Sequence, residues 1–341
     1  MKSLPFLPKS EYEALPPQAP LRRMKAAIAD HADAERVDFS TTLFPAIIKD
    51  AYEAYYRALE RITPGALAIP IEQIIARIDA AGVRSIAGVT DTATPDSAFL
   101  PWALDGVTVD PTDQWNHLVE IDPLAEFDGD TEQLQAFMHE RLATDVLDAA
   151  RGTMSARKAA LWTISACRKP AAVFGEQGRY TLESRRGDFD TLMGFGQMVG
   201  SGPPAFRTRE LLALAEAGVV SFVLPQNAAA AIEQADVVLD AFLPSPDIHR
   251  SADPLIAGLR ADGRLQPFTY DGVSTASPDV DPRTRLLAGD PRVHLIGIPT
   301  HAQYADTTIS PMPGTDPTML RETDAAARSA LAVACGHDWQ A

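Results

Sequence analysis

Helical apolar patterns in the first half of this chain constrain its fold more than any other sequence feature. In the strongest pattern, at residues 45–61, apolar residues recur at spacings of three and four, as on one face of a helix. The residues that give this spacing are Ile47, Ile48, Ala51, Tyr55, Ala58, Leu59 and Ile62. A turn is expected before it at residues 38–42, and Thr63-Pro64-Gly65 should end it.

Further helices have recognisable ends. The longest can be capped by Asp130 or Thr131, and Gly152 should stop it. The next begins at Ser155 and is expected to end at residue 167, before Pro170. The remaining helices are expected at residues 21–35, 71–81, 185–199, 208–217, 254–260 and 317–335.

Strands are expected where β-branched and other apolar residues gather between turn signals. These stretches are residues 83–89, 219–224, 235–243 and 293–298. Residues 90–128, rich in Asp, Pro and Thr, should form a loop with short strands. The pattern as a whole predicts a helix-rich α/β fold with a helical N-terminal half.

Composition narrows the class of protein. Of the 341 residues, 46% are hydrophobic and 22% charged, as in globular proteins. The net charge of −16 repels phosphates and anionic lipids, so we expect no nucleic-acid or membrane partner. Cys167 and Cys335 are too few for a disulfide framework, and no spacing of ligands predicts a metal site. No apolar run has the length of a membrane span or the form of a signal peptide, so a cytoplasmic location is expected.

Motifs for known chemistry are largely missing. A doubly wound nucleotide-binding fold needs a strand, a Gly-x-Gly-x-x-Gly turn and a helix. The near match at residues 194–200 has one residue too many and follows a helical pattern, so we interpret it as a glycine-containing helix end. We interpret Asp145 and Asp148 as the solvated face of a helix, and no catalytic residue can be assigned. His301 follows an expected strand, where α/β proteins place ligand contacts.

Two segments carry more specific patterns. Gly202-Pro203-Pro204 forms a rigid turn that leads into a helix, and Gly218 ends that helix before an expected strand. Residues 294–300 have the sequence His-Leu-Ile-Gly-Ile-Pro-Thr, which predicts a buried strand broken by glycine and then a proline-fixed loop.

In order and spacing, these segments resemble the FAD/NAD(P)-binding proteins related to flavin-dependent monooxygenases. The resemblance covers most of residues 140–334. Within that range, it includes residues 145–161, Asp240-Ala241, Gly272, Val280-Asp281-Pro282 and the terminal helix. Long members of that family have an N-terminal FAD-binding Rossmann region, a central pyridine-nucleotide or substrate region, and a strand that returns to the FAD domain. The resemblance therefore implies an oxidoreductase architecture that uses FAD and NAD(P)H.

The resemblance also implies roles for particular residues. Gly297, Ile298, Pro299 and Thr300 would form the returning strand and loop that close over the isoalloxazine or ribityl part of FAD, and His301 follows them. Gly202, Pro203 and Arg207 would lie at a structural junction of the second nucleotide-binding region.

The front of the chain departs from that family. It starts with five prolines within its first twenty residues and continues with helices, where long members carry the FAD fingerprint. The expected regions are an extended arm at 1–20, a helical region with loops at 21–130, a nucleotide- or substrate-type α/β region at 131–290, and a returning strand with a terminal helix at 291–341.

Two functions follow from this departure. The chain is either a component of a FAD/NAD(P)-binding oxidoreductase or monooxygenase acting on a small molecule, or a non-catalytic protein-interaction module derived from that family. As a component, it would need a FAD-domain partner chain or the missing front. A missing front would leave an apolar surface that requires covering, so a partner chain or a homo-oligomer is expected.

Overall fold

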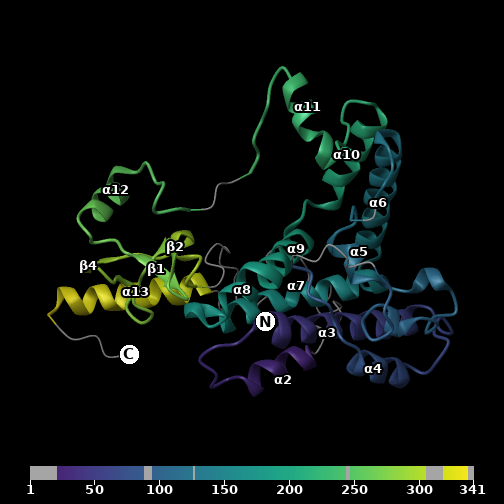
Figure 1. Cartoon of the computed structure of the whole chain (residues 1–341), viewed down its shortest axis with the longest axis horizontal. Coiled ribbons are helices and arrows are strands. Elements are labelled where there is room, and N and C mark those ends of the chain that lie inside the picture. Colours follow the sequence, from purple (N-terminus) through teal and green to yellow (C-terminus); the bar gives the residue numbers. More distant parts are fainter. Residues whose placement is uncertain (1–20, 88–93, 126, 243–245, 305–317, 337–341) are drawn as a thin grey trace, which may run out of the picture.

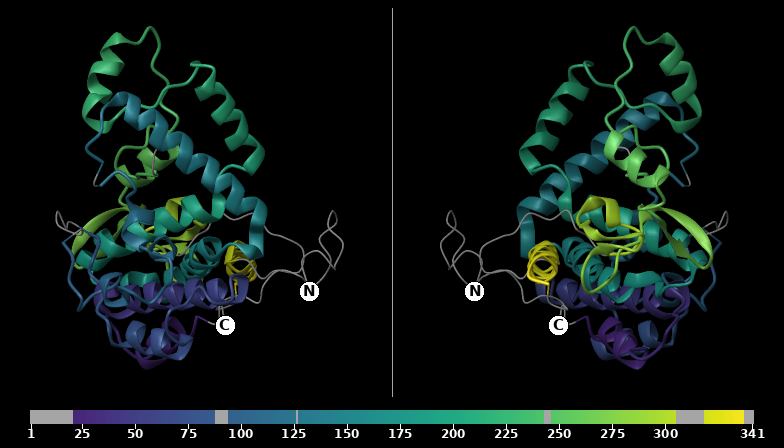
Figure 2. Two further views of the ribbon diagram at one scale, coloured as in Figure 1. Left: turned by 90° about the vertical axis from the view of Figure 1, so that its right-hand side faces the viewer. Right: turned by 90° about the vertical axis from the view of Figure 1, so that its left-hand side faces the viewer.

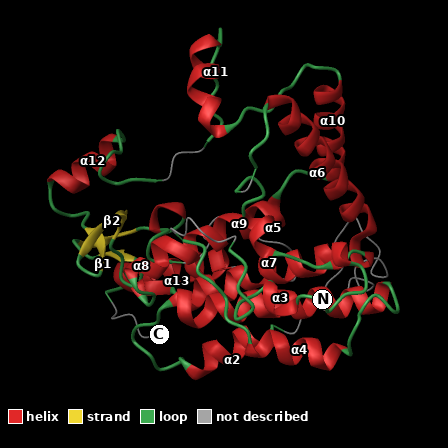
Figure 3. Ribbon diagram, turned by 45° about the vertical axis from the view of Figure 1, so that its right-hand side comes forward, coloured by secondary structure: helices red, strands yellow, loops and turns green. Residues whose placement is uncertain are grey.

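The computed structural model describes residues 21–87, 94–125, 127–242, 246–304 and 318–336 (Figure 1). The arm expected at residues 1–20 lies outside these described residues. Helices make up most of the described chain, and its strands form two small sheets, which confirms the helix-rich α/β class. Figures 2 and 3 show a helical body, a smaller module that contains the strands, and helices that project from the body.

The body is centred on two long helices that pack along each other. These are α3 (Phe39–Ile62) and α7 (Ala156–Phe174), and the helices around them are α2 (Arg22–Asp30), α4 (Ile71–Ala80) and α9 (Asp190–Ser201). The turn expected at residues 38–42 is wrong. The carboxylate of Asp38 accepts a hydrogen bond from the backbone N–H of Thr41 at 3.0 Å, so it caps α3 and the helix starts at once.

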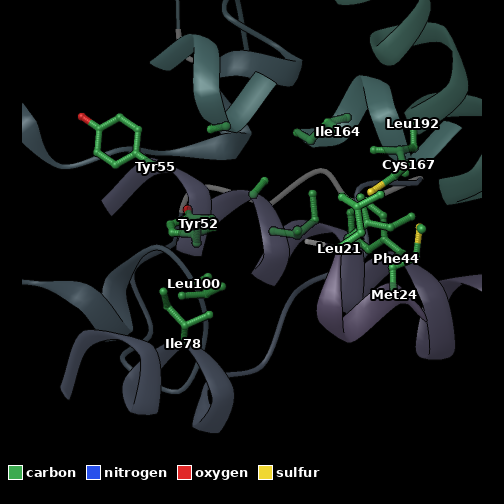
Figure 4. Packing of buried hydrophobic residues seen from close by; sticks show 14 of the residues in the cluster. Leu21, Met24, Phe44, Tyr52, Tyr55, Ile78, Leu100, Ile164, Cys167 and Leu192 are labelled. Carbon is green, nitrogen blue, oxygen red and sulfur yellow. The ribbon is translucent and has the colours of Figure 1, made fainter. Parts of the chain in front are cut away.

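Aromatic side chains fill the core between these helices. Phe39, Phe44, Tyr52 and Tyr180 are completely buried, and several of the core residues are drawn in Figure 4. The ring of Phe39 meets that of Tyr180 edge-on at a centroid distance of 5.1 Å. Burial of each such ring stabilises the fold by roughly 1.5–3 kcal/mol, which explains how apolar spacing alone could place α3.

Helix α7 continues past the residue expected to end it. Pro170 lacks an N–H for the carbonyl of Ala166, which normally favours a break. Downstream of it, however, Ala171 and Phe174 are buried in the core, and the Tyr180 hydroxyl donates to the Ala171 carbonyl at 2.6 Å. Tertiary packing therefore extends the helix beyond residue 167.

A π-helical turn, η5 (Arg185–Phe189), links α8 (Leu182–Ser184) to α9, where a single helix was expected. Its buried Asp188 accepts hydrogen bonds from the Ser85 hydroxyl and from the backbone N–H groups of Ile86 and Ala87, at 2.8–3.0 Å. The strand expected at residues 83–89 is wrong over its described part, because Asp188 holds that segment as single extended chain.

The expected loop at 90–128 contains short helices in its described part, with isolated bridges in place of strands. The short helices are η1 (Trp102–Leu104), η2 (Pro111–Asp113) and α5 (His117–Ile121). Helix α6 (Thr131–Arg151) follows with the expected bounds. Asp130 and Gln133 form a reciprocal capping box, and Gly152 ends the helix with a positive φ.

The smaller module surrounds its own apolar cluster, which includes Leu259, Leu265 and Val280. Its elements are α12 (Pro254–Ala261), β1 (Pro267–Tyr270), β2 (Val273–Pro278), β3 (Leu286–Leu287), β4 (Asp290–His294), η7 (Ile298–Thr300) and α13 (Thr318–Ala334). The strands pair as two antiparallel hairpins, β1 with β2 and β3 with β4.

The strand expected at 293–298 overlaps β4 only at its end. Gly297 has φ 91° and ψ −158°, a conformation that essentially only glycine adopts, and the chain turns there into η7. Across the described residues, no parallel sheet is formed.

The projecting part consists of α6, α10 (Ala205–Glu216) and α11 (Ala228–Gln234), as Figure 1 shows. The strands expected at 219–224 and 235–243 are wrong over their described residues, which belong to no sheet. Their β-branched side chains favour a sheet only where a neighbouring strand completes it.

Candidate active-site cavity

A cavity of about 1060 Å³ lies where the projecting helices leave the body. Residues from α3, α6 and α7 form most of its wall. The end of α9, the start of α10, and Glu120 of α5 with the loop that follows it also contribute. Leu142, Val146, Leu161 and Met198 contribute apolar surface, together with Trp162, whose side chain is half exposed. The size and the apolar lining suit a small organic ligand.

A network of charges crosses one wall of this cavity. The guanidinium of Arg157 contacts both carboxylate oxygens of Glu120, at 2.6 and 2.8 Å. Arg141 donates to the same carboxylate at 3.2 Å, and Lys158 donates to Asp145 at 2.6 Å. Groups of both signs of charge therefore line the cavity together with the apolar residues.

Burial and ion pairing shift the pKa values of the two arginines in opposite directions. Burial by itself lowers the pKa of Arg157, but its hydrogen bonds to Glu120 and the nearby carboxylates outweigh this and raise the pKa above its usual value. Burial lowers the pKa of Arg141, and the charge of Glu120 only partly opposes that effect. Both arginines remain charged near neutral pH.

The local sequence explains how the network forms. Ser155 caps α7 by accepting a hydrogen bond from the backbone N–H of Lys158, which places Arg157 and Lys158 in the first turn of that helix. Cations at a helix N-terminus oppose the helix dipole, so they need carboxylates from elsewhere. Asp145 and Asp148, one turn apart on α6, supply two of them.

This network corrects the interpretation of Asp148 as part of a solvated helix face. Asp148 is buried and paired with Arg157, while Asp145 is more exposed. Sequence reasoning missed Glu120, Arg141 and Arg157 altogether. The available signal was the pair of cations at the start of a helix, where the dipole disfavours them.

Of the three residues expected at the junction of the second nucleotide-binding region, two line the cavity and one does not. Gly202 and Pro203, which follow α9, form part of its wall. Arg207 is not among the described lining residues. Its guanidinium donates to Glu210 at 2.7 Å and lies over the ring of Phe206, on the exposed face of α10.

The expected FAD-contacting loop, Gly297, Ile298, Pro299, Thr300 and His301, belongs to the smaller module instead. Thr300 is buried and donates to the Gly297 carbonyl at 2.8 Å, and the His301 Nδ1 lies 3.1 Å from the hydroxyl of Ser277 in β2. Burial lowers the pKa of His301, so its ring is neutral near pH 7. None of these residues is among those described as lining the cavity, so the structure does not bring the two expected sets together there.

The described residues do not fit a dinucleotide cradle. Residues 194–200 lie within α9, and this confirms their interpretation as helix. A Cβ at Gly196 would lie 2.5 Å from Arg168, and one at Gly200 would lie 2.3 Å from Ser165. These glycines therefore allow α9 to approach α7 closely, and no strand precedes them to form a phosphate turn.

The described part of the chain lacks two other kinds of feature. It contains no group of three or more His, Cys, Asp or Glu side chains placed to hold a metal ion. It also contains no helix of the length and apolar character that a membrane crossing requires.

No family model matches this chain. It is 27% identical over 332 residues to an L-aspartate N-monooxygenase (nitrosuccinate-forming) of Streptomyces cremeus, with 88% of this chain and 47% of that protein covered. It is 26% identical over 322 residues to the enzyme of the same name from Streptomyces davaonensis, with 86% and 47% covered. Nitrosuccinic acid synthase npaA of Aspergillus oryzae is 31% identical over 153 residues, or 39% of this chain and 24% of that protein.

These similarities confirm the expected likeness to monooxygenases at the level of that enzyme class. The chain spans about half the length of the Streptomyces relatives that it matches.

Proposed function

We propose that this chain is one component of a flavin-dependent N-monooxygenase that oxidises the amine of a small acidic amino acid. The single observation that carries the proposal is the similarity to L-aspartate N-monooxygenases over 88% of the chain. Because the described residues hold no dinucleotide cradle, we place FAD on a second half that is supplied separately, with NAD(P)H as the reductant.

The charges of the cavity support an amino acid as the substrate. Such a molecule carries an ammonium group and carboxylates, and Asp145 and Lys158 offer one partner for each. The side chain of Asp145 is 43% exposed, so the pair opens at little cost and can be exchanged for pairs with the ligand. Gly202 and Pro203 would then form part of the substrate chamber.

The loop at Gly297–His301 would contact the flavin half in the assembled enzyme. Its glycine is held in a conformation that few other residues adopt, and the space beside its Cα is open. The chemistry of a bound flavin would come from the second half, and this chain would bind and orient the amino acid and exclude water.

A spectrum tests where the flavin is held. The purified chain, alone and after addition of FAD and gel filtration, should show no retained visible absorbance of flavin and no rise in Tm. Retention of stoichiometric FAD by the chain alone would contradict a separately supplied half.

A reconstitution tests the activity itself. The part of the Streptomyces cremeus protein that this chain does not match serves as the second half, mixed with this chain, FAD, NADPH and L-aspartate. We expect amino-acid-dependent consumption of NADPH and O₂ and formation of an N-oxidised product. Each component alone is the control, and a mixture that binds FAD but oxidises no amine rejects the proposed reaction.

One observation favours the alternative, a non-catalytic interaction module. Exposed apolar residues, including Leu239 and Phe242, gather beyond α11, and the phosphate cradle is missing from the described residues. In that case, the chain would bind a partner chain or a second copy of itself, and the reconstituted mixture would form a complex without amine oxidation.

A further inference from the structure

Two segments on either side of α11 have no neighbouring strand among the described residues. Residues 219–224 and residues 235–242, here called the open segments, belong to no sheet. Figure 1 shows α11 at the far end of the projecting part, and the described chain that follows it, up to residue 242, runs away from α10 and α6. The extended chain is thus formed without the neighbouring strands that normally stabilise it.

The open segments have the composition of strands buried on both faces. Val219-Val220-Ser221-Phe222-Val223-Leu224 is apolar except at one position, and Val237-Val238-Leu239 is continuously apolar. Continuous runs of this kind are typical of parallel strands with helices on both sides of the sheet. A helix between two such runs, as α11 is here, is the order of a β-α-β unit.

One edge of the first open segment is already satisfied. The side-chain amide of Gln135, on α6, accepts a hydrogen bond from the Phe222 N–H at 2.8 Å and donates to the Phe222 carbonyl at 2.8 Å. It takes the place of a neighbouring strand. The peptide groups of Ser221 and Val223 face the opposite edge, because they alternate along extended chain, and the structure records no backbone hydrogen bond from either to another described residue.

The second open segment is the more exposed of the two. The side chains of Leu239 and Phe242 are 87% and 89% exposed, and Val237 is 73% exposed. The structure records no hydrogen bond from the Val238 backbone N–H to another described residue. Exposed apolar surface that is contiguous with unpaired backbone marks a site where another chain adds to a sheet.

We infer that the open segments are two strands of a parallel sheet whose remaining strands come from the nucleotide-binding half of the enzyme. This inference rests on the proposed function and adds to it the surface at which the two halves join. The length of the relatives favours this occupant, since about half of their length is unmatched by this chain. A second copy is less suited, because two chains of net charge −16 repel each other.

Association and hydrogen exchange test the inference directly. The probe is the part of the Streptomyces cremeus protein that this chain does not match, produced as a separate polypeptide. Sedimentation velocity should show a one-to-one complex, and backbone amides of both open segments should exchange at least tenfold more slowly within it. FAD, NADPH and amino acid are omitted, so that binding is measured apart from catalysis.

Two variants and a matched control locate the contact. Val238→Pro removes an N–H that the complex would use, and Leu239→Asp places a charge on the apolar face, so each should weaken the Kd at least tenfold. Leu331→Asp changes an exposed leucine of α13 and should alter the Kd less than twofold. Val238→Pro and Leu239→Asp should keep the Tm of the isolated chain, because neither the Val238 nor the Leu239 side chain is buried there.

Several outcomes would overturn the inference. These are no complex, a complex whose protected amides lie outside the open segments, or a dimer of this chain that protects the same residues. A complex that forms as expected but oxidises no amine after FAD, NADPH and L-aspartate are added would reject the proposed function and leave the docking surface standing.

Discussion

At the residue scale, Glu120 is the group on which the charge network depends, because it pairs with both Arg141 and Arg157. Replacing it by Gln leaves two half-buried guanidinium groups without that carboxylate. We expect Glu120→Gln to lower the free energy of unfolding by about 2–4 kcal/mol in urea titrations. Asp324→Asn, which breaks an exposed pair with Arg328 on α13, should cost less than about 1 kcal/mol. Equal effects would mean that the network contributes no more than a surface pair.

A second residue-scale prediction concerns pH. His117 is buried beside the Tyr52 hydroxyl, 3.0 Å from its Nδ1, and burial lowers the pKa of His117 to about 3. The unfolded chain binds a proton near pH 6.5 and the folded chain does not, so stability should fall as the pH drops below 6.5, towards 3.

The measurement is the free energy of unfolding from about pH 7.5 down to about pH 5. This range brackets the ordinary histidine pKa of roughly 6.5. His117 should contribute a loss approaching 1.4 kcal/mol per pH unit, about the limit for one proton. His117→Gln should flatten the profile by that amount. An unchanged slope in the His117 variant would show that this ring is protonated in the fold.

At the element scale, η5 fixes the segment at residues 85–87 through Asp188. The Asp188 Oδ1 accepts hydrogen bonds from the Ser85 hydroxyl and from the backbone N–H groups of Ile86 and Ala87. Asp188→Ala removes the acceptor and leaves three partly buried donors without it, which should cost about 1–3 kcal/mol. The amides of Ile86 and Ala87 should then exchange faster. Asp188→Asn keeps an acceptor oxygen and should have the smaller effect; if both variants behave alike, charge and not geometry holds the segment.

How far the sequence predicts an element depends on where the decisive contact lies. Helix α6 could be predicted to the residue, because Asp130 and Gly152 act within one turn of its ends. The continuation of α7 beyond Pro170 could not be predicted, because the hydrogen bond that stabilises it comes from Tyr180, outside the helix. The strands expected at 219–224 and 235–243 depend on a neighbour that the described residues do not provide.

The same reasoning applies to the candidate site. Gly202 and Pro203 were expected, from the resemblance alone, at a junction of the second nucleotide-binding region, and they line the cavity. Glu120 and Arg141 carry no motif and meet only through packing of α5, α6 and α7. Spacing along the chain holds no information about pairs of this kind.

At the scale of the whole molecule, the cavity lies at the base of the projecting part that carries the open segments. Helices α6 and α10 of that part border the cavity, and α10 leads to the first open segment (Figure 3). A second half docked there would also cover the exposed side of the cavity helices. Exclusion of water strengthens charge interactions with a bound amino acid, so the proposed assembly and the proposed substrate site support each other.

The assembled enzyme allows the substrate site to be tested. Lys158→Met keeps the length and apolar stem of the side chain but removes the charge that pairs with Asp145. In the reconstituted mixture, we expect the KM for L-aspartate to rise at least tenfold, equivalent to about 1.4 kcal/mol of binding, while kcat changes little. Arg328→Met, an exposed position on α13, serves as the control and should leave both constants unchanged. If Lys158→Met lowers kcat and leaves KM unaltered, the lysine does not bind the amino acid, and the cavity is not the chamber where the substrate is held.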